Sequence, residues 1–262
     1  MLKVFKSRSK FWLLAVCTAL VVWLLHFLHW DDRLLFLWQE HKTSTPQQAD
    51  SIWLSGYRAV IQAKPLAGLE KSETSGLSWS PLSNTLFTVT GRIPKLVELS
   101  LDGEVLRVVE LRGFSDPEGV EVLSDGRIAI IDERRGQLVL FYLPLDAQFI
   151  DAAALTPLSL GSNAGSNKGF EGVAWDARQQ RMLFAKERSP FGLFSLPFPE
   201  LANDLAPVVS VLEELPSKQI FMRDFSSLAI DQRTGHLLVL SDESRMLLEL
   251  DEAGNPVSFI SL

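Results

Sequence analysis

Four related units follow one another along most of the chain, and this repetition is the strongest constraint that the sequence places on the fold. Each unit has a short apolar run, a turn, a second apolar run, a charged loop and a third run. In the second unit these are residues 120–123, 124–126, 128–131, 132–136 and 138–143. Short runs with turn residues at this spacing indicate antiparallel strands and not helices.

The length of the units predicts the architecture. They begin near Ser75, Glu118, Glu171 and Ser226, which lie 43, 53 and 55 residues apart. Units of this size with up to four strands are typical of β-propeller blades. A β-sandwich also consists of short strands, but that fold gives no reason for the same residues at the same point of every unit. We therefore predict an all-β chain, with a β-propeller of four recognisable blades over residues 52–262.

An apolar, uncharged stretch over residues 11–28 precedes the repeat. As a helix it is about 27 Å long, enough to cross a bilayer core. Bases before it and acids after it orient the N-terminus toward the cytoplasm. We predict a basic cytoplasmic tail (1–10), a transmembrane signal anchor (11–30) and a polar juxtamembrane stalk (31–51). The propeller then lies in the periplasm of a bacterium, held at the inner membrane.

A cleaved signal peptide is the alternative interpretation of the same stretch. Its apolar region is usually shorter and ends in small residues, whereas residues 26–30 of this chain read His-Phe-Leu-His-Trp. The uncleaved anchor is therefore the preferred prediction.

Charge limits the partners that the domain can bind. The net charge is -7, and the part after residue 30 is more acidic still because the first thirty residues carry bases and no acid. Such a surface repels phosphate backbones, which argues against nucleic acid and for cations or basic partners. The one cysteine, Cys17, lies in the apolar stretch, so the propeller cannot contain a disulfide.

Acidic residues recur at two equivalent points of the units. Glu118 and Glu171 each precede a glycine at the start of a first strand. A second set lies in the charged loop after the second strand and consists of Glu133, Glu187 and Glu243. In a propeller both points lie on the same face, so we expect the two sets on one rim of the central channel.

Glutamates from neighbouring blades that point at one channel mouth repel each other, so either their pKa values rise or a cation bridges them. Calcium suits such a site in an exported protein because it takes about six to eight oxygens in irregular geometry. The predicted metal ligands are Glu118, Glu171, Glu133, Glu187 and Glu243.

A purely structural interpretation stays open beside the metal site. The Glu-Gly pairs can mark strand starts, and the loop glutamates can form surface ion pairs. Asp116 and Asp224 lie two residues before the first strands of their units. They could add metal-binding oxygens or accept hydrogen bonds from loop N–H groups.

Taken together, the ordered motifs resemble the SdiA-regulated family over residues 52–262. The motifs are Ser75-Gly76-Leu77, Asp116-Pro117-Glu118-Gly119, Asp132-Glu133-Arg134, Gly169-Phe170-Glu171-Gly172, Lys186-Glu187-Arg188 and residues 238–245. The resemblance implies an N-terminal anchor, a five-bladed propeller distantly similar to NHL repeats, and a calcium site that falls best on Glu118 and Glu171. It implies no established biochemical activity.

The chain departs from the family pattern at its end. That pattern continues into a further blade, whereas this sequence stops at Leu262, at the end of the fourth unit's last strand. Two outcomes are expected: either an early strand near residues 57–63 closes a smaller ring, or the last blade is missing and the propeller is open.

Function follows less directly from the residues. We expect a module that binds a periplasmic protein or a small molecule; the alternative is a calcium-dependent hydrolase, like a lactonase or esterase, acting at the channel mouth. Three of the four histidines lie in or beside the apolar stretch, and His236 is expected on the opposite face from the glutamates. The sequence also has no G-x-S-x-G elbow. These features make the binding module the preferred prediction.

Overall fold

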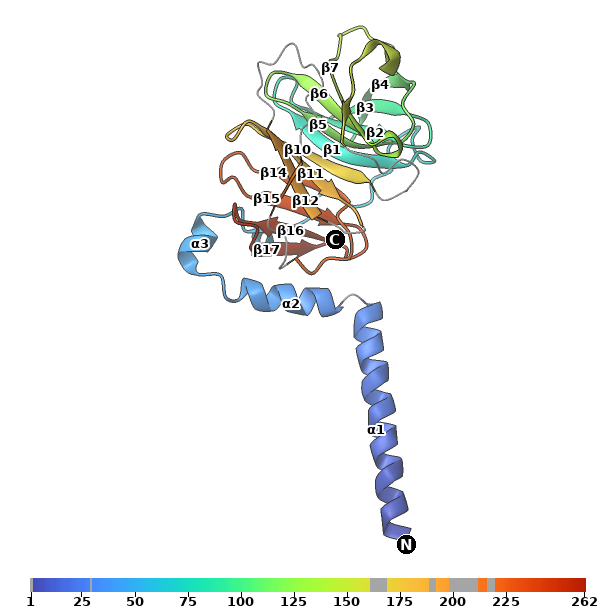
Figure 1. Cartoon of the computed structure of the whole chain (residues 1–262), viewed down its shortest axis with the longest axis vertical. Helices are drawn as coiled ribbons and strands as arrows, with labels where there is room; N and C mark the ends of the chain where they lie inside the picture. The colour runs from blue at the N-terminus through green and yellow to red at the C-terminus, as the bar shows by residue number, and fades with distance from the viewer. Residues whose placement is uncertain (1, 29, 161–168, 189–191, 198–211, 216–219) are drawn as a thin grey trace.

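Strands dominate the computed structural model, which describes residues 2–28, 30–160, 169–188, 192–197, 212–215 and 220–262. In this part of the chain the strands form one sheet of five strands and three sheets of four. The sheets follow one another around a common centre, at one end of a long N-terminal helix (Figure 1). This is the four-bladed β-propeller arrangement that the repeat predicted.

Each sheet is one blade, and its strands run outward from the channel in sequence order. The first blade contains β1 (Thr74–Ser80), β2 (Thr85–Thr90), β3 (Lys95–Leu99), β4 (Val105–Arg112) and, parallel to β4, β8 (Phe149–Asp151). The second contains β5 (Pro117–Val122), β6 (Arg127–Asp132), β7 (Gln137–Tyr142) and β9 (Leu158–Ser159). The third contains β10 (Phe170–Asp176), β11 (Arg181–Lys186), β12 (Gly192–Pro197) and β13 (Glu213–Glu214). The fourth contains β14 (Ser227–Ile230), β15 (Leu237–Ser241), β16 (Met246–Leu250) and β17 (Pro256–Ser261).

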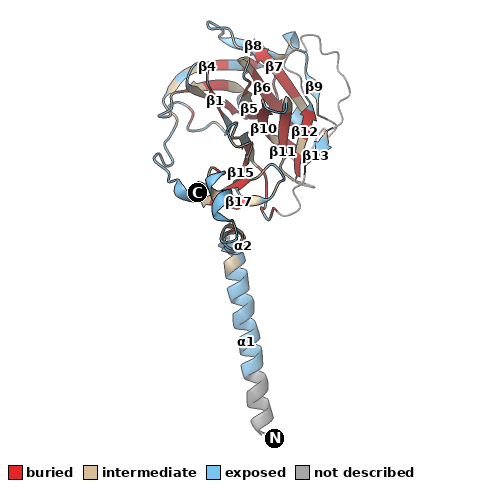
Figure 2. Cartoon of the chain, turned by 90° about the vertical axis from the view of Figure 1, so that its left-hand side faces the viewer, coloured by how far each residue is buried: buried red, intermediate tan, exposed pale blue. Residues whose placement is uncertain are grey.

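The second strands are apolar throughout because blades cover both of their faces. In β6, Ile128 and Ile130 belong to the core shared with the first blade, whereas Ala129 and Ile131 belong to the core shared with the third. Strands buried on both sides lose the alternation of apolar and polar residues that a half-exposed strand shows. Buried residues accordingly run through the central strands of the domain (Figure 2).

The glycine of each Glu-Gly pair lets neighbouring inner strands approach each other. A Cβ atom at Gly119 would lie 2.6 Å from the backbone oxygen of Glu171 in the next blade. A Cβ atom at Gly172 would lie 2.8 Å from the backbone nitrogen of Leu228 in the blade after that. Both positions therefore need a residue without a side chain, and blade packing alone accounts for these two glycines.

A cleft separates the first blade from the fourth. The inner strands pack side by side in the order β1, β5, β10 and β14, and a cavity of about 680 Å³ lies between the two end members of this series. Ser75 and Thr88 line it from the first blade, and Ser227 and Leu240 line it from the fourth. The described part of the propeller is thus open on this side.

The strand expected near residues 57–63 is wrong, since this segment contains no strand. It bridges the cleft instead: Leu54 N donates to Ser258 Oγ of the fourth blade at 2.8 Å, while Leu69 packs in the core of the first blade. Val60 is 87% exposed. A chain that must span two separated blades runs along neither sheet edge, so apolar residues alone did not make it a strand.

One helix of the described residues is long and apolar enough to cross a membrane, over residues 10–27. It belongs to α1 (Leu2–Phe27), and its apolar window is entirely exposed. The bases Lys3, Lys6 and Arg8 of the predicted cytoplasmic tail lie outside the described side chains.

The polar stalk expected over residues 31–51 is instead helical and partly packed on the domain. It contains α2 (Trp30–Glu40) and α3 (Thr45–Ala49). Phe36 is 1% exposed, and its ring centroid lies 6.0 Å from that of Phe259 in β17. The stalk prediction failed because it weighed the charged residues of the segment and overlooked an apolar face at helical spacing.

Candidate metal centre

Hydrogen bonds hold the two predicted loop sets on one rim. In the second blade Glu133 N donates to Asp116 O at 2.9 Å, and in the third blade Glu187 N donates to Gly169 O at 3.1 Å. The loop that leads into the first strand of a blade is thereby tied to the loop that follows its second strand. This places the acidic residues of both sets at one end of the inner strands.

A buried aspartate fixes the loop of the second blade. Asp132 is 1% exposed, and its carboxylate accepts hydrogen bonds from Ser115 N at 2.8 Å and from Asp116 N at 3.1 Å. Carboxylates that accept from loop N–H groups stabilise turns in this way. Asp132 therefore positions Asp116 beside the strand start.

The two strand-start glutamates lie at irregularities of their strands. The register between β5 and β6 shifts between Pro117 and Gly119, and that between β10 and β11 shifts between Phe170 and Gly172. Glu118 and Glu171 are the residues that fall in these shifts. A β-bulge turns a side chain away from its regular direction, which explains how both glutamates come to lie at the rim.

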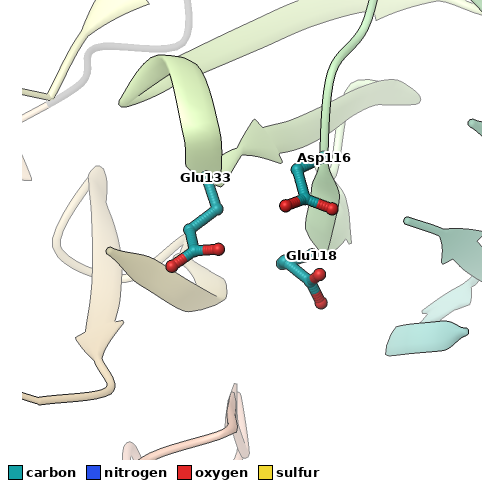
Figure 3. A group of neighbouring side chains, drawn as sticks. All are labelled: Asp116, Glu118 and Glu133. Carbon is teal, nitrogen blue, oxygen red and sulfur yellow. The ribbon is translucent and has the colours of Figure 1, made fainter. Parts of the chain in front are cut away.

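Five carboxylates form two overlapping groups there. Oxygen atoms of Asp116, Glu118 and Glu133 lie within 4.8 Å of one another, and so do those of Glu133, Glu171 and Glu187. Figure 3 shows the first group, with the three side chains facing a common space. Glu133 belongs to both groups and so links the second blade to the third.

Burial and mutual repulsion disfavour charge on these side chains. Burial raises the pKa of Glu118 to about 7, and the carboxylates of Asp116 and Glu133 raise it further, while a hydrogen bond from Ser75 opposes the rise. For Glu171, burial and then the charges of Glu187, Glu118 and Glu133 raise the pKa to about 9. Carboxylates in this state gain from a nearby cation.

Glu133 is the most buried member of the two groups, at 7% exposure. Burial raises its pKa, although Gly169 N donates to its Oε1 at 2.7 Å and opposes the rise. A Cβ atom at Gly169 would lie 2.6 Å from Cγ of Glu133. The glycine before the third strand start is thus needed for the glutamate to fit.

Basic residues neutralise the edges of the two groups. Arg134 Nη2 lies 2.8 Å from Asp116 Oδ2, and Arg188 Nε lies 2.7 Å from Glu187 Oε1. The same Arg188 forms an ion pair with Glu243. Glu243, predicted from sequence as a ligand, therefore lies outside both groups, whereas Glu118, Glu133, Glu171 and Glu187 come together.

The two aspartates left open by the sequence have different roles. Asp116 joins the first carboxylate group. Asp224 is 3% exposed and accepts hydrogen bonds from the Ser241 hydroxyl and from Glu243 N. It fixes a loop of the fourth blade, as Asp132 does in the second.

The donor set fits calcium. It consists of carboxylate oxygens alone, it comes from several segments in irregular geometry, and two of its members have strongly raised pKa values. Hard oxygen donors without nitrogen or sulfur favour calcium or magnesium over zinc. The residues that could hold the ion are Asp116, Glu118, Glu133, Glu171 and Glu187.

Sequence reasoning missed Glu121, a half-buried glutamate on β5. Its carboxylate accepts from Ser78 Oγ in the first blade at 2.8 Å and from Trp175 N in the third blade at 3.1 Å. Burial raises its pKa to about 7, and these two hydrogen bonds oppose the rise. Its one signal in the sequence is a glutamate within an apolar run. Glu121 joins three neighbouring inner strands.

His236, the one histidine of the propeller region, belongs to another part of the fourth blade. Its Nδ1 lies 2.7 Å from Oε1 of Glu249, which is fully buried. The Glu249 carboxylate also accepts from the backbone nitrogens of Ile52 at 2.7 Å and Trp53 at 3.0 Å. This histidine thus helps to fasten the linker to the fourth blade.

Comparison with known proteins supports both the family and the fold. A family model described as SdiA-regulated matches residues 49–262. Among solved structures, the chain resembles a virginiamycin B lyase from Staphylococcus aureus with quinupristin, at 12% identity over 76% of this chain and 58% of that chain, with a TM-score of 0.45. It also resembles a periplasmic gluconolactonase of Pseudomonas aeruginosa, at 14% identity over 72% of this chain and 53% of that chain, with a TM-score of 0.42. The chain thus spans little more than half the length of either protein.

Proposed function

Because the chain belongs to the SdiA-regulated family, we propose that it is a membrane-anchored, calcium-binding β-propeller that serves as a binding module in the periplasm. The observation that carries the proposal is the pair of carboxylate groups that share Glu133. Five acidic side chains in this space repel one another, and a divalent cation would relieve that repulsion.

Calcium would act on the join between two blades. Asp116, Glu118 and Glu133 come from the second blade, while Glu171 and Glu187 come from the third. An ion held by oxygens from both blades favours the state in which they are packed, because the unfolded chain offers no such site. The rim then presents a fixed surface to a protein or a small molecule.

The anchor follows from α1, which leaves its apolar window exposed beside a domain that is otherwise folded on its own core. An exposed apolar helix of this length is stable in a bilayer and not in water. Together with the charge bias that orients α1, this supports a domain on the periplasmic side of the inner membrane.

The test uses the full chain purified in detergent. Calcium added after chelation should raise the thermal unfolding temperature, because a ligand present at about 100 times its Kd stabilises the native state by about 2.7 kcal/mol. Glu118→Gln combined with Glu171→Gln should abolish the rise. Glu243→Gln is the matched control, since it changes a rim glutamate outside both groups, and it should keep the full rise. An unchanged calcium response in the double variant would contradict the proposed site.

A further inference from the structure

The short helix α2 occupies a position that the domain alone does not explain. α1 ends at Phe27 and α2 begins at Trp30, and α2 lies across the end of α1, between it and the fourth blade (Figure 1). A connection this short keeps the start of α2 close to the depth at which α1 ends. If α1 spans the bilayer, that depth is the headgroup region.

The domain holds one face of α2 firmly. Phe36 packs on β17, and the Asp32 carboxylate accepts hydrogen bonds from Arg223 Nε at 3.1 Å and from Ser244 Oγ at 3.0 Å. Arg223 Nη2 also donates to the backbone oxygen of His26 near the end of α1, at 2.8 Å. The fourth blade thereby fixes the angle between α1 and α2.

The other face of α2 is apolar and uncovered. It carries Trp30, Leu34, Leu37 and Trp38, which follow helical spacing and are 50%, 49%, 53% and 58% exposed. A water-soluble helix would carry polar residues on this side. The helix thus has one apolar face against the blade and a second with no partner among the described residues.

The residue types on the free face are those of a membrane interface. Trp30 and Trp38 lie at the two ends of the stripe, and tryptophan is enriched at the headgroup level of bilayers. The Lys42 ammonium lies 3.0 Å from the centre of the Trp38 ring, so the stripe ends beside a cation that can reach lipid phosphates. The stripe also continues from the exposed end of α1, where Phe27 is 63% exposed.

We propose that the stripe formed by Trp30, Leu34, Leu37 and Trp38 binds the lipid headgroup–acyl boundary, so that α2 lies in the plane of the membrane surface. The inference rests on the proposed membrane anchor. It gives α2 the function of a fixed platform: the bilayer holds one face, the fourth blade holds the other, and the propeller cannot swing freely on α1. The first and second blades then lie farthest from the membrane (Figure 1).

Nitroxide labels in the full chain reconstituted into phosphatidylcholine–phosphatidylglycerol vesicles test this placement. In a Cys17→Ser background, single cysteines replace Leu34 or Leu37 on the stripe, Leu20 in α1, or Leu145, which is 96% exposed on the domain. Oxygen concentrates in the bilayer, and a nickel chelate stays in water. The oxygen-to-nickel collision ratio should be several-fold higher at Leu34 and Leu37 than at Leu145, and closer to that at Leu20.

Each other outcome has a separate meaning. A low ratio at Leu20 would show that α1 is not inserted, and the proposed anchor itself would fail. A high ratio at Leu20 with Leu145-like ratios at Leu34 and Leu37 would overturn the platform and leave the anchor intact. Protection of the stripe labels from both reagents would mean that protein covers them, such as a second copy of the chain, and would also overturn lipid binding.

Discussion

Replacing Glu171 with glutamine should stabilise the calcium-free protein at neutral pH, although it removes a proposed metal ligand. Burial and the charges of Glu187 and Glu118 raise the pKa of this carboxyl from 4.5 to about 9 in the folded protein. At about pH 7.5 the wild-type side chain must therefore take up a proton on folding. Glutamine has nearly the same shape and needs no proton.

The size of the effect follows from this difference in pKa. Between the unfolded value of 4.5 and about pH 7.5, proton uptake at Glu171 costs about 4 kcal/mol at full weight. Because the side chain is only partly buried, solvent screening reduces the gain on substitution to roughly 2 kcal/mol. A domain of this size shifts its unfolding temperature by about 2–4 °C per kcal/mol, so Glu171→Gln should raise it by about 4–8 °C.

The pH dependence identifies the cause. A carboxyl with a raised folded pKa contributes stability that is complete below its unfolded pKa and is lost as the pH rises through the folded value. Wild-type stability without calcium should thus fall from about pH 4.5 to about pH 9, and the variant should lose less. Thermal unfolding of the full chain in detergent and chelator, followed by circular dichroism at several pH values, measures both profiles.

Two results would refute this reasoning. One is a variant no more stable than wild type at about pH 7.5; the other is a gain of equal size at about pH 4.5, where the wild-type carboxyl is already neutral in both states. Glu243→Gln serves as control, because this exposed glutamate is paired with Arg188 and its replacement should change stability by less than about 1 kcal/mol.

Two further substitutions test the packing between blades and the attachment of the linker. Gly119→Ala should cost about 2 kcal/mol in urea unfolding because its Cβ would lie 2.6 Å from the Glu171 backbone oxygen; Gly56→Ala, whose nearest atom is 3.9 Å away, should be near neutral, and equal effects would contradict the packing argument. Glu249→Ala should cost about 3 kcal/mol, since it leaves the N–H groups of residues 52–53 without their acceptor; it should also speed their amide hydrogen exchange, and unchanged exchange would show that the carboxylate does not hold the linker.

The sequence was sufficient for the fold because a propeller repeats its chemistry. Turn residues and apolar runs recur at the same points of each unit, and alternate residues of a strand such as Ile130 and Ile131 must each find a blade to pack against. Local strand pairing between consecutive runs then builds each sheet. The same pattern identified the rim residues, since equivalent positions of successive blades lie at equivalent places around the channel.

Contacts between distant segments could not be predicted in this way. Residues 57–63 have an apolar pattern, yet they cross a cleft in which no strand edge is available to them. The segment that includes α2 has charged residues and reads as a stalk, yet Phe36 finds a buried place on β17, more than two hundred residues later in the chain. Whether an apolar residue is buried depends on a partner surface that its own neighbours in sequence do not specify.

The division is clearest at the rim. By itself the sequence determined that Glu118 and Glu171 start inner strands and that Glu133, Glu187 and Glu243 follow second strands. Only the tertiary structure decided which of these carboxylates share one space, because that depends on strand bulges that turn side chains by one position and on where a basic side chain reaches. Arg188 lies beside Glu187 and pairs with Glu243, so Glu187 stays with the two carboxylate groups while Glu243 does not. Electrostatic neutralisation over a few ångströms is a property of the assembled surface, and no spacing along the chain encodes it.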